Sequence, residues 1–430
     1  MDKFIIQGGQ KLSGEVIPSG NKNAALPLLA ACLLTDEPVI LHNVPDIRDV
    51  QAMRALLESL GVQTHNLSPH TWQLRARDIR PADLDPDLCK RIRASILLAG
   101  PMVARAGNLQ LPPPGGEVIG RRRVDTHILA IRSLGAYAEF DRANRVFDFR
   151  APYLTGADIL MDEASVTATE NAIMAAVRAR GTTILRNAAS EPHIQELCHF
   201  LNILGAKIQN IGSNTLVIDG VERLHGGEFT IGPDYLEVVS FIGAAVVTRS
   251  SIRIRQAGPE YLGMIRLVFG RLGVEWQVEG DDVIVPAEQR LIIEPDLGDA
   301  IPVISVMPWP SFPTDLMSIA IVVSTQSRGS VLFHDWMYPS RMYFTDKLVS
   351  MGAQIVLCDP HRCIVQGPSQ MFGEKLESPD IRAGMALVLA ALAAEGQSVI
   401  RNVGQIDRGY EQIDQKLRSL GAHISREREA

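Results

Sequence analysis

The sequence predicts an α/β protein built from six copies of one helix–strand repeat, with three copies in each of two domains. Three observations lead to this prediction. A Leu/Met-Gly-apolar motif occurs six times, a β-rich segment precedes each glycine at a nearly constant distance, and an apolar helical segment precedes each strand. A repeat of this kind forms one supersecondary unit, which buries its apolar face against neighbouring copies.

The motif marks the end of a helix, because glycine accepts the left-handed backbone conformation that closes a helix C-terminus. Single Leu-Gly-Ala sequences carry little information, but six copies separated by 68 to 79 residues indicate a repeat. A strand should follow each helix end. The six glycines are Gly61, Gly135, Gly205, Gly273, Gly352 and Gly421.

The strand before each glycine fixes the length of the repeat. In five repeats the last strand residue lies 19 or 20 positions before the glycine, whereas in the second repeat Leu111 lies 24 positions before Gly135. About five extra residues therefore fall in the connection 112–123, which reads PPPGGEVIGRRR. A loop that departs from its own repeat is a candidate for function. The five regular strand ends are His42, Arg186, Ile254, Phe333 and Arg401.

The remaining elements follow in chain order. Residues 3–7 read as a strand, and the all-apolar segment 24–34 as a buried helix that should begin near residue 24, because Pro27 is tolerated in a first turn. Equivalent buried helices are predicted over 95–104, 170–179, 236–247, 315–325 and 382–394, with short extra strands at 215–218 and 283–285.

Length sets the domain organisation. A chain of 430 residues exceeds one typical core, and three repeats make about 215 residues, a common domain size. We expect residues 22–230 to form the first domain, carrying the loop 112–125, and residues 1–21 with 231–430 to form the second.

Composition excludes several classes of function. The net charge of −7 disfavours nucleic-acid binding, so an anionic ligand needs a local basic cluster. Five cysteines without a CxxC pair indicate a reducing compartment, and the histidines show no metal spacing, so we expect no metal and no cofactor. The longest apolar runs have 11 and 12 residues, against about 20 for a membrane span. The start of the chain reads as a strand and not as a signal peptide. We expect a cytoplasmic protein with small-molecule substrates and no membrane or nucleic-acid partner, with a monomer favoured.

Two basic clusters are candidates for anion binding. Lys22 and Asn23 fall at a predicted helix N-terminus, where backbone N–H groups and the helix dipole favour anions, although a capping Asn and a solvated Lys would look the same. The loop carries Arg121, Arg122 and Arg123, and arginine suits planar recognition of phosphate and carboxylate. Its glycines suggest a closing lid. The alternative is a solvated charged loop.

Three charged residues in the second half are further candidates. Asp315 opens a buried helix, where an acidic residue often acts only as a cap. Arg382 occupies the same place in the last repeat, and Arg408 lies in the sequence IDRGY. Either arginine alone would more commonly form a surface ion pair.

Taken together, these motifs resemble the UDP-N-acetylglucosamine enolpyruvyl transferase family over essentially the whole chain. The matching motifs are SGNKNAALP at 19–27, RAS at 93–95, PGG at 114–116, VDTH at 124–127, FPTD at 312–315 and IDRGYE at 406–411. The resemblance implies two domains of three βαβαββ units, with an active site in the cleft between them.

The resemblance also implies a reaction and a set of roles. The enolpyruvyl group of phosphoenolpyruvate would move to the 3′-hydroxyl of UDP-N-acetylglucosamine by addition and elimination, releasing phosphate, as the first committed step of peptidoglycan synthesis. Lys22, Arg122 and Arg408 would hold phosphoenolpyruvate, and Asp315 would take the hydroxyl proton. The implied substrate-binding set further contains Asn23, Arg93, Arg123, Val124, Asp125, Thr126, Ser165, Val166, Thr169, Leu332, Arg341 and Arg382.

Two residues depart from the family pattern. Glu117 stands where the family usually has the loop cysteine that is credited with protonating the methylene carbon and is alkylated by fosfomycin. A glutamate has an ordinary pKa near 4.3 against about 8.5 for cysteine, but burial on lid closure would raise it. We expect an active, fosfomycin-insensitive enzyme with Glu117 as the acid. Glu163 stands where a lysine often lies near the nucleotide diphosphate, which a carboxylate would repel unless it turned outward.

Other functions remain open at the level of sequence. One alternative is a sister enzyme, either 5-enolpyruvylshikimate-3-phosphate synthase or an enolpyruvyl transferase acting on another nucleotide sugar. A second is a non-catalytic regulator that binds UDP-sugars, which the loss of the cysteine favours and the retention of Asp315 disfavours.

Overall fold

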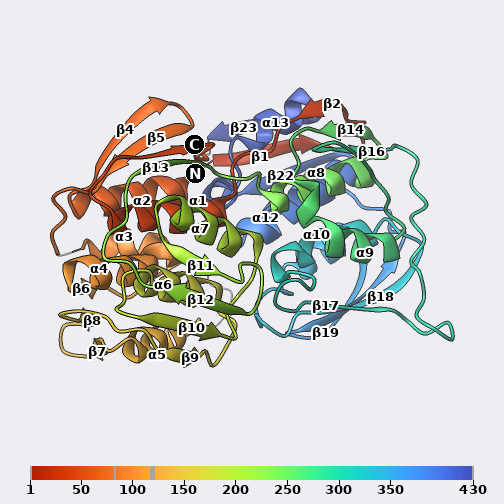
Figure 1. The fold of residues 1–430 in the computed structure, drawn as a ribbon. Helices are drawn as coiled ribbons and strands as arrows, with labels where there is room; N and C mark the ends of the chain where they lie inside the picture. Colours follow the sequence, from red (N-terminus) through yellow and green to blue (C-terminus); the bar gives the residue numbers. More distant parts are fainter. Residues whose placement is uncertain (1, 82–83, 117–121, 429–430) are drawn as a thin grey trace. The chain divides into compact units, whose positions relative to one another are not determined.

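The computed structural model describes residues 2–81, 84–116 and 122–428. The chain divides into two compact units. Residues 20–116 and 122–232 form the first unit, and residues 2–19 and 233–428 form the second (Figure 1). The chain therefore passes between units at residues 19/20 and 232/233, two residues from each of the boundaries expected from sequence.

Both passages are fixed by backbone hydrogen bonds within the units. In the first unit the N–H of Asn21 donates to the carbonyl of Gly232 (2.8 Å), and in the second the N–H of Asp234 donates to the carbonyl of Ser19 (2.9 Å). The outgoing and returning segments thus lie side by side.

The first unit contains buried helices and three sheets. Its helices are α1 (Lys22–Ala31), α2 (Arg48–Ser59), α3 (Pro86–Arg91), α4 (Ala99–Ala106), α5 (Asp125–Ser133), α6 (Val166–Ala176) and α7 (Pro192–Ile203), with the 3-10 helices η1 (Cys32–Leu34) and η2 (Arg93–Leu98). Its strands are β3 (Val39–His42), β4 (Gln63–Ser68), β5 (Thr71–Arg75), β6 (Asn108–Leu111), β7 (Tyr137–Asp141), β8 (Val146–Arg150), β9 (Asp158–Leu160), β10 (Thr182–Arg186), β11 (Lys207–Gln209), β12 (Thr215–Asp219) and β13 (Gly227–Thr230).

The second unit repeats this plan. Its helices are α8 (Tyr235–Val247), α9 (Gly263–Arg271), α10 (Met317–Ser324), α11 (Thr345–Ser350), α12 (Ile381–Ala393) and α13 (Ile413–Ser419), with η3 (Pro259–Tyr261), η4 (Thr314–Leu316) and η5 (Val403–Arg408). Its strands are β1 (Asp2–Gln7), β2 (Ser13–Val16), β14 (Ser251–Ile254), β15 (Gln277–Glu279), β16 (Asp282–Val285), β17 (Val303–Ser305), β18 (Gly329–His334), β19 (Gln354–Asp359), β20 (Arg362–Gly367), β21 (Lys375–Glu377), β22 (Gln397–Arg401) and β23 (His423–Arg428).

Five of the six sheets in the described residues share one topology. Three antiparallel strands carry a fourth, parallel strand at one edge, as in the order β11-β12-β10-β9, where β9 runs parallel to β10. In each unit one parallel edge strand comes from the far end of that unit's sequence: β13 joins β3, and β2 joins β14. The predicted fold of six βαβαββ-type repeats is confirmed.

The second repeat is the exception. Its sheet, β6-β8-β7, has three strands in the described residues. The helix α3 precedes it in the chain, where the other repeats supply the parallel edge strand. This is also the repeat with the enlarged loop, so the departure seen in the sequence coincides with a departure in structure.

The six repeat-ending glycines confirm the predicted helix ends. All six have positive φ, between 77° and 106°. Each follows its helix by two residues, and each is followed by a strand of the same repeat. The helices so closed are α2, α5, α7, α9, α11 and α13.

The predicted start of the first buried helix is wrong by two residues. Helix α1 begins at Lys22 and carries Pro27 in its interior. The cause is the cap, because the side chain of Asn21 accepts hydrogen bonds from the N–H groups of Asn23 and Ala24 (2.8 and 3.3 Å). Lys22 is therefore the first helical residue.

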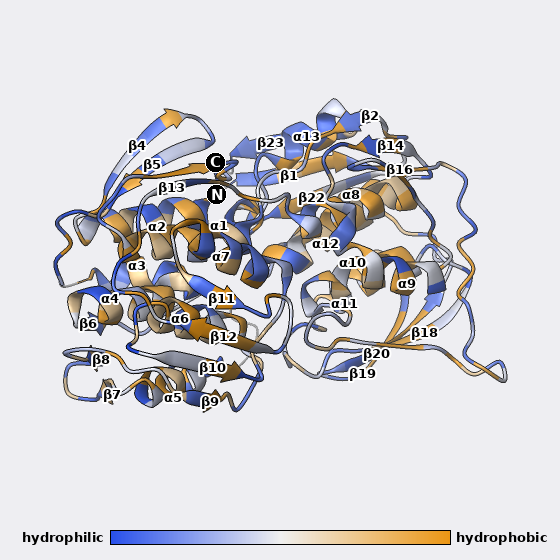
Figure 2. Cartoon of the chain, viewed as in Figure 1, coloured by the Kyte–Doolittle hydropathy of each residue, from blue (hydrophilic) through white to orange (hydrophobic). Residues whose placement is uncertain are grey.

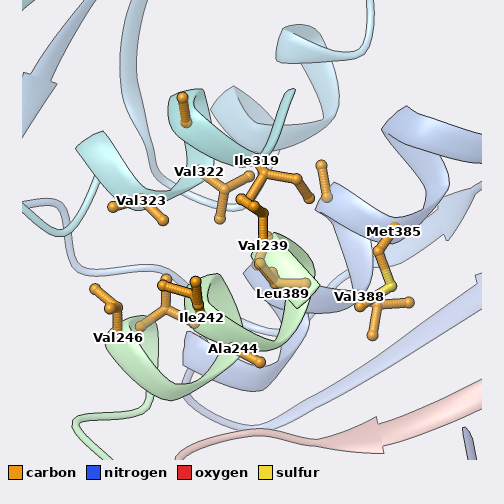
Figure 3. Close-up of a cluster of buried hydrophobic side chains, with 14 of the residues drawn as sticks. Val239, Ile242, Ala244, Val246, Ile319, Val322, Val323, Met385, Val388 and Leu389 are labelled. Atoms are coloured by element: carbon orange, nitrogen blue, oxygen red, sulfur yellow. The ribbon is translucent and has the colours of Figure 1, made fainter. Parts of the chain in front are cut away.

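Three buried helices form the centre of each unit. In the second unit α8, α10 and α12 pack against one another, and Figure 3 shows Val239 and Ile242 meeting Ile319, Val323 and Leu389. Figure 2 shows α8 as mostly hydrophobic. The helices approach closely at one glycine in α8: a Cβ on Gly243 would lie 2.6 Å from Leu389 Cδ2, so a larger residue would force the Leu389 side chain to move. No helix in the described part of the chain is both long and apolar enough to cross a bilayer.

Candidate active site

Lys22 begins α1 and lies in a buried ion pair. Its Nζ is 2.7 Å from Oδ2 of Asp49 on α2, and the two side chains are 9% and 7% exposed. Burial of two charges is compensated only by close pairing, so Asp49 fixes the ammonium group at the start of the helix. Asn23 lies beside it, half-buried. The ammonium group, the helix N-terminus and the amide thus lie together at one corner of the first unit.

The N-terminal part of the enlarged loop is held against the last turn of α3. The N–H groups of Gly115 and Gly116 donate to the carbonyls of Cys89 (3.1 Å) and Lys90 (3.3 Å). A Cβ on Gly115 would lie 1.8 Å from the carbonyl oxygen of Lys90. Gly115 therefore permits close contact between the two backbones.

The C-terminal part of the loop is held by Arg93. Its Nη2 donates to the carbonyls of Arg122 (3.2 Å) and Arg123 (2.7 Å). The predicted site residue Arg93 therefore positions the loop backbone, in addition to any contact with a ligand. Glu117, predicted as the acid, and Arg121 lie outside the described residues.

An acidic pair orients the start of α5. Arg123 contacts Asp125 (3.3 Å) and Asp162 (3.0 Å), and the hydroxyl of Thr126 donates to Asp162 Oδ1 (2.7 Å). The hydrogen bond to Asp125 is the main cause of a raised pKa of Arg123. Val124 is half-buried against the core of the unit. Four predicted site residues in 123–126 thus form one hydrogen-bonded turn with Asp162, which the sequence prediction did not include.

Beneath this turn lies a buried histidine network. His127 is 1% exposed, and burial lowers its pKa to about 3, with the charge of Arg93 adding to the effect. The neutral imidazole bonds to Thr167 Oγ1 (3.1 Å) and Asn171 Nδ2 (2.8 Å). Asn171 also donates to the carbonyl of Ile96 (2.8 Å). This network ties η2, α5 and α6 together.

Ser165, Val166 and Thr169 lie at the start of α6. Ser165 is the N-cap residue, but its side chain makes no capping hydrogen bond. Thr169 is 0% exposed, donates to the Ser165 carbonyl (2.8 Å) and accepts from the N–H of Ala189 (3.0 Å). Its hydroxyl is committed to the fold, so Thr169 supports this helix start from below. Glu163 is exposed, as its outward orientation would require.

In the second unit, one carboxylate lies between two guanidinium groups. Arg341 Nη2 donates to Asp315 Oδ1 (2.7 Å), and Arg382 Nε donates to Asp315 Oδ2 (3.1 Å). Both arginine side chains are less than a tenth exposed, whereas that of Asp315 is 26% exposed. The carboxylate is therefore oriented by buried cations and still reaches solvent, as a proton acceptor for a bound hydroxyl must.

Neighbouring elements hold these groups in place. Arg382 is the second residue of α12, whose N-terminus is capped by Asp380 (2.8 Å to the Arg382 N–H). Its guanidinium lies 5.7 Å from the ring centre of Tyr410, whose hydroxyl bonds to Ser240 (2.9 Å). Burial is the main cause of a raised pKa of Tyr410.

Arg408 ends η5 close to Tyr410 in sequence and is half-buried, with Nη1 donating to Gln405 (3.1 Å). The preceding residue, Asp407, is clamped by both Nη atoms of Arg426 (2.9 and 2.7 Å). Leu332 lies on β18, half-buried, between the buried Val331 and Phe333. The structure thus brings Asp315, Arg341 and Arg382 into contact, whereas Arg408 and Leu332 lie on separate elements of the same unit.

In the second unit these residues combine buried guanidinium groups with the partly exposed carboxylate of Asp315. No group of three His, Cys, Asp or Glu side chains among the described residues is placed to hold a metal ion. Supporting residues that sequence reasoning missed include Asp49, Asp162, Asn171, Asp335 and Arg426. Each acts through a contact with a residue far away in sequence, so no local motif identified it.

Known proteins resemble the chain over its whole length. Residues 6–417 match the family model for EPSP synthase (3-phosphoshikimate 1-carboxyvinyltransferase). The UDP-N-acetylglucosamine 1-carboxyvinyltransferase of Bradyrhizobium diazoefficiens is 56% identical over 424 residues, which cover 99% of this chain and 98% of the relative. The protein of the same name from Treponema denticola is 53% identical and covers 99% of each chain.

Solved structures agree in fold. The enolpyruvyl transferase NikO from Streptomyces tendae superposes with a TM-score of 0.87 at 26% identity, covering 100% of this chain and 99% of the other. EPSP synthase from Acinetobacter baumannii gives a TM-score of 0.77 at 15% identity, with full coverage of both chains, a likeness in fold alone.

Proposed function

The chain belongs to the EPSP synthase family of carboxyvinyltransferases, and we propose that it transfers the enolpyruvyl group of phosphoenolpyruvate to the 3′-hydroxyl of UDP-N-acetylglucosamine, releasing phosphate. Full-length relatives named for this activity are 47% to 56% identical. EPSP synthase structures are only 14% and 15% identical. This contrast favours the sugar nucleotide over shikimate 3-phosphate as the acceptor.

The observation that carries the chemistry is Asp315 held by two buried arginines. A carboxylate fixed at 2.7 and 3.1 Å from Arg341 and Arg382 has one orientation, and its exposure leaves it open to a hydroxyl group. General-base removal of the hydroxyl proton contributes roughly 10²- to 10⁴-fold to a rate when the base is so placed. We assign this role to Asp315.

The cationic residues suit an anionic three-carbon substrate. Phosphoenolpyruvate carries a phosphate and a carboxylate, and Lys22, Arg122 and Arg408 are assigned to these groups. Asp49 keeps Lys22 in place at the helix N-terminus. The start of α6, with Ser165 and Val166, and the turn 123–126 are assigned to the sugar nucleotide, together with Asn23 and Arg93. Thr169 supports them from beneath.

This activity places the protein at the first committed step of peptidoglycan synthesis, and with it in cell-wall biogenesis, cell shape and division. The expected location is the cytoplasm, and the protein is expected to need no cofactor. Glu117 is proposed as the acid that replaces the usual cysteine.

The test follows phosphate release by the purified protein from phosphoenolpyruvate with either UDP-N-acetylglucosamine or shikimate 3-phosphate. We expect release with the sugar nucleotide alone. Release only with shikimate 3-phosphate would assign the sister activity. Tight binding of UDP-N-acetylglucosamine with no release would indicate the non-catalytic regulator, and neither binding nor release would indicate another nucleotide sugar as acceptor.

A further inference from the structure

One buried carboxylate connects the two segments that bring Asp315 and Arg341 together. Asp335 follows β18 and is 0% exposed. Its Oδ2 accepts a hydrogen bond from the hydroxyl of Thr314 (2.5 Å). Its Oδ1 accepts from the N–H groups of Met337 (3.0 Å) and Tyr338 (3.2 Å).

These contacts lie directly beside the candidate base. Thr314 immediately precedes Asp315 in η4. The turn that begins at Tyr338 leads to Arg341, whose N–H donates to the Tyr338 carbonyl (3.2 Å) and whose guanidinium lies 5.3 Å from the Tyr338 ring centre. Since Arg341 binds Asp315, the contacts form a closed circuit that begins and ends at Asp335.

The backbone of Asp335 is itself fixed from the opposite side. Its N–H donates to the carbonyl of His361 (2.8 Å), and its own carbonyl bonds to His361 Nδ1 (2.7 Å). The next charged groups on that side, Asp359 and Arg362, form an ion pair with each other. The carboxylate of Asp335 therefore has little freedom to move.

Burial of this carboxylate has an energetic cost that the fold compensates locally. Desolvation raises the pKa of Asp335, and the Thr314 hydroxyl, the charge of Arg341 and the two backbone N–H groups oppose that rise. An acidic side chain in this position is retained against its desolvation cost, and all the groups that compensate for it belong to the two segments flanking Asp315 and Arg341.

We propose that Asp335 is a positioning residue for proton transfer: by holding Thr314 and the 337–338 turn, it fixes the Asp315 carboxylate opposite Arg341. The inference rests on the proposed function, in which Asp315 is the base. Displacement of a catalytic group by about 1 Å can cost about 10²-fold in rate while ground-state binding is preserved. The expected signature of Asp335 is thus a change in kcat with little change in KM.

The experiment compares the parent with Asp335→Ala, Asp335→Asn, Thr314→Val and the Asp335→Ala/Thr314→Val double variant. Asp359→Asn is the matched control, since it removes a carboxylate that binds the N–H of His361 and the guanidinium of Arg362 instead of Thr314 or Arg341. Steady-state kcat and KM for both substrates are measured, with thermal unfolding to establish the folded fraction.

We expect Asp335→Ala to lower kcat by roughly 10- to 100-fold, with KM for UDP-N-acetylglucosamine changed by less than about threefold. In Asp335→Asn the amide oxygen can accept from both N–H groups and the amide nitrogen can donate to the Thr314 hydroxyl oxygen, so kcat should recover to within about fivefold of the parent. The double variant should be no slower than Asp335→Ala, because both changes break one contact. Asp359→Asn should match the parent.

An unchanged kcat in Asp335→Ala, or additive losses in the double variant, would overturn the inference and leave the proposed function standing. Failure of the parent to release phosphate would instead reject the proposed function. In that case the role of Asp335 is tested without an activity assay, by the rate at which the Nε–H proton of Arg341 exchanges with water. The NMR signal of this proton is assigned by its loss in Arg341→Lys. We expect it to exchange faster with water in Asp335→Ala than in the parent and in Asp359→Asn, and equal exchange would reject Asp335 as a positioning residue.

Discussion

Lys22 Nζ lies 2.7 Å from Asp49 Oδ2, in an ion pair whose two side chains are each less than a tenth exposed. The pair joins the first residue of α1 to the first turn of α2. A buried pair contributes little relative to an apolar pair of similar size, but loss of one partner leaves an uncompensated charge. The free energy of unfolding and the position of the Lys22 ammonium group therefore both depend on Asp49.

The first prediction follows from this pair. Asp49→Asn should lower the free energy of unfolding of the first unit by about 3 kcal/mol, because it leaves the Lys22 ammonium buried without its counter-charge. Denaturant unfolding is followed by the fluorescence of Trp72, the one tryptophan in the sequence between residues 20 and 232. The control Asp158→Asn breaks the exposed pair with Arg186 and should cost less than about 1 kcal/mol. Equal costs for the two variants would contradict this account.

The second prediction concerns acid stability and His127. Its pKa is about 3 in the folded protein and near 6.5 when the chain unfolds, so between these values the unfolded state binds a proton that the folded state does not. The contribution of His127 to the free energy of unfolding is fully present above about pH 6.5 and decreases as the pH falls below that value. The loss should be about 2.5 kcal/mol between pH 6.5 and 4.5.

The measurement is denaturant unfolding at several pH values. His127→Gln should be less stable than the parent at pH 7 but should show a shallower decline towards pH 4.5. His199→Gln, which removes an exposed imidazole from α7, should keep the decline of the parent. A His127→Gln curve parallel to that of the parent would assign the acid sensitivity to other groups.

The third prediction compares two glycines that close helices in the same way. Gly135 has φ of +91° and open space around a Cβ, whereas Gly273 has φ of +77° and a Cβ would lie 2.4 Å from the Ile292 nitrogen. Gly135→Ala should cost about 1 kcal/mol for backbone conformation alone. Gly273→Ala should cost several times more, measured by denaturant unfolding. Similar costs would mean that the Ile292 segment moves aside.

The fourth prediction tests the assigned base. Asp315→Asn keeps the size of the side chain but cannot accept the hydroxyl proton, so kcat for phosphate release should fall roughly 10²- to 10⁴-fold. KM for UDP-N-acetylglucosamine should change little. Asp346→Asn, an exposed aspartate on α11, serves as the control and should keep the parent rate. An Asp315→Asn variant with more than a tenth of the parent kcat would exclude Asp315 as the base.

The fifth prediction concerns the loop acid. Phosphate release by the parent should be insensitive to fosfomycin, because Glu117 has no thiol to be alkylated, and Glu117→Cys should become sensitive. Glu117→Gln should lose turnover, and undiminished turnover would remove Glu117 from the mechanism. The exposed Cys358 is replaced by serine in all variants, so that any inhibition reports on position 117. Inhibition of the Cys358→Ser protein with Glu117 intact would contradict the prediction.

The repeats could be predicted because their signals are local. A left-handed glycine after a helix depends on a few neighbouring residues, and all six such ends occur as expected. The start of α1 was predicted from the preference of Pro27 for a first helical turn. In the structure the capping side chain of Asn21 determines the start instead. The resemblance selected Asp315, Arg341 and Arg382, but their contacts span 26 and 67 residues, and no spacing rule predicts them.

The supporting residues were beyond sequence reasoning for a physical reason. Asp49 in a first helical turn looks like an ordinary partner for the helix dipole, and Asp335 at a strand end looks like a solvated turn residue. Their roles depend on burial, which is set by the packing of other repeats. Residues of this kind are identified only when the tertiary contacts are known.

The pairing of β1 and β2 sets the order in which the chain can assemble during synthesis. These strands are made before the whole first unit, yet their partners β14, β22 and β23 begin at residues 251, 397 and 423. The first unit is complete once residue 232 has left the ribosome, so it can fold while the N-terminal segment waits unpaired with Phe4 and Ile6 uncovered. The second unit closes only after β23 (His423–Arg428) has been made. The nascent chain therefore carries an unpaired apolar strand until β22 and β23 have been made, and exposed apolar segments of this kind are prone to aggregation.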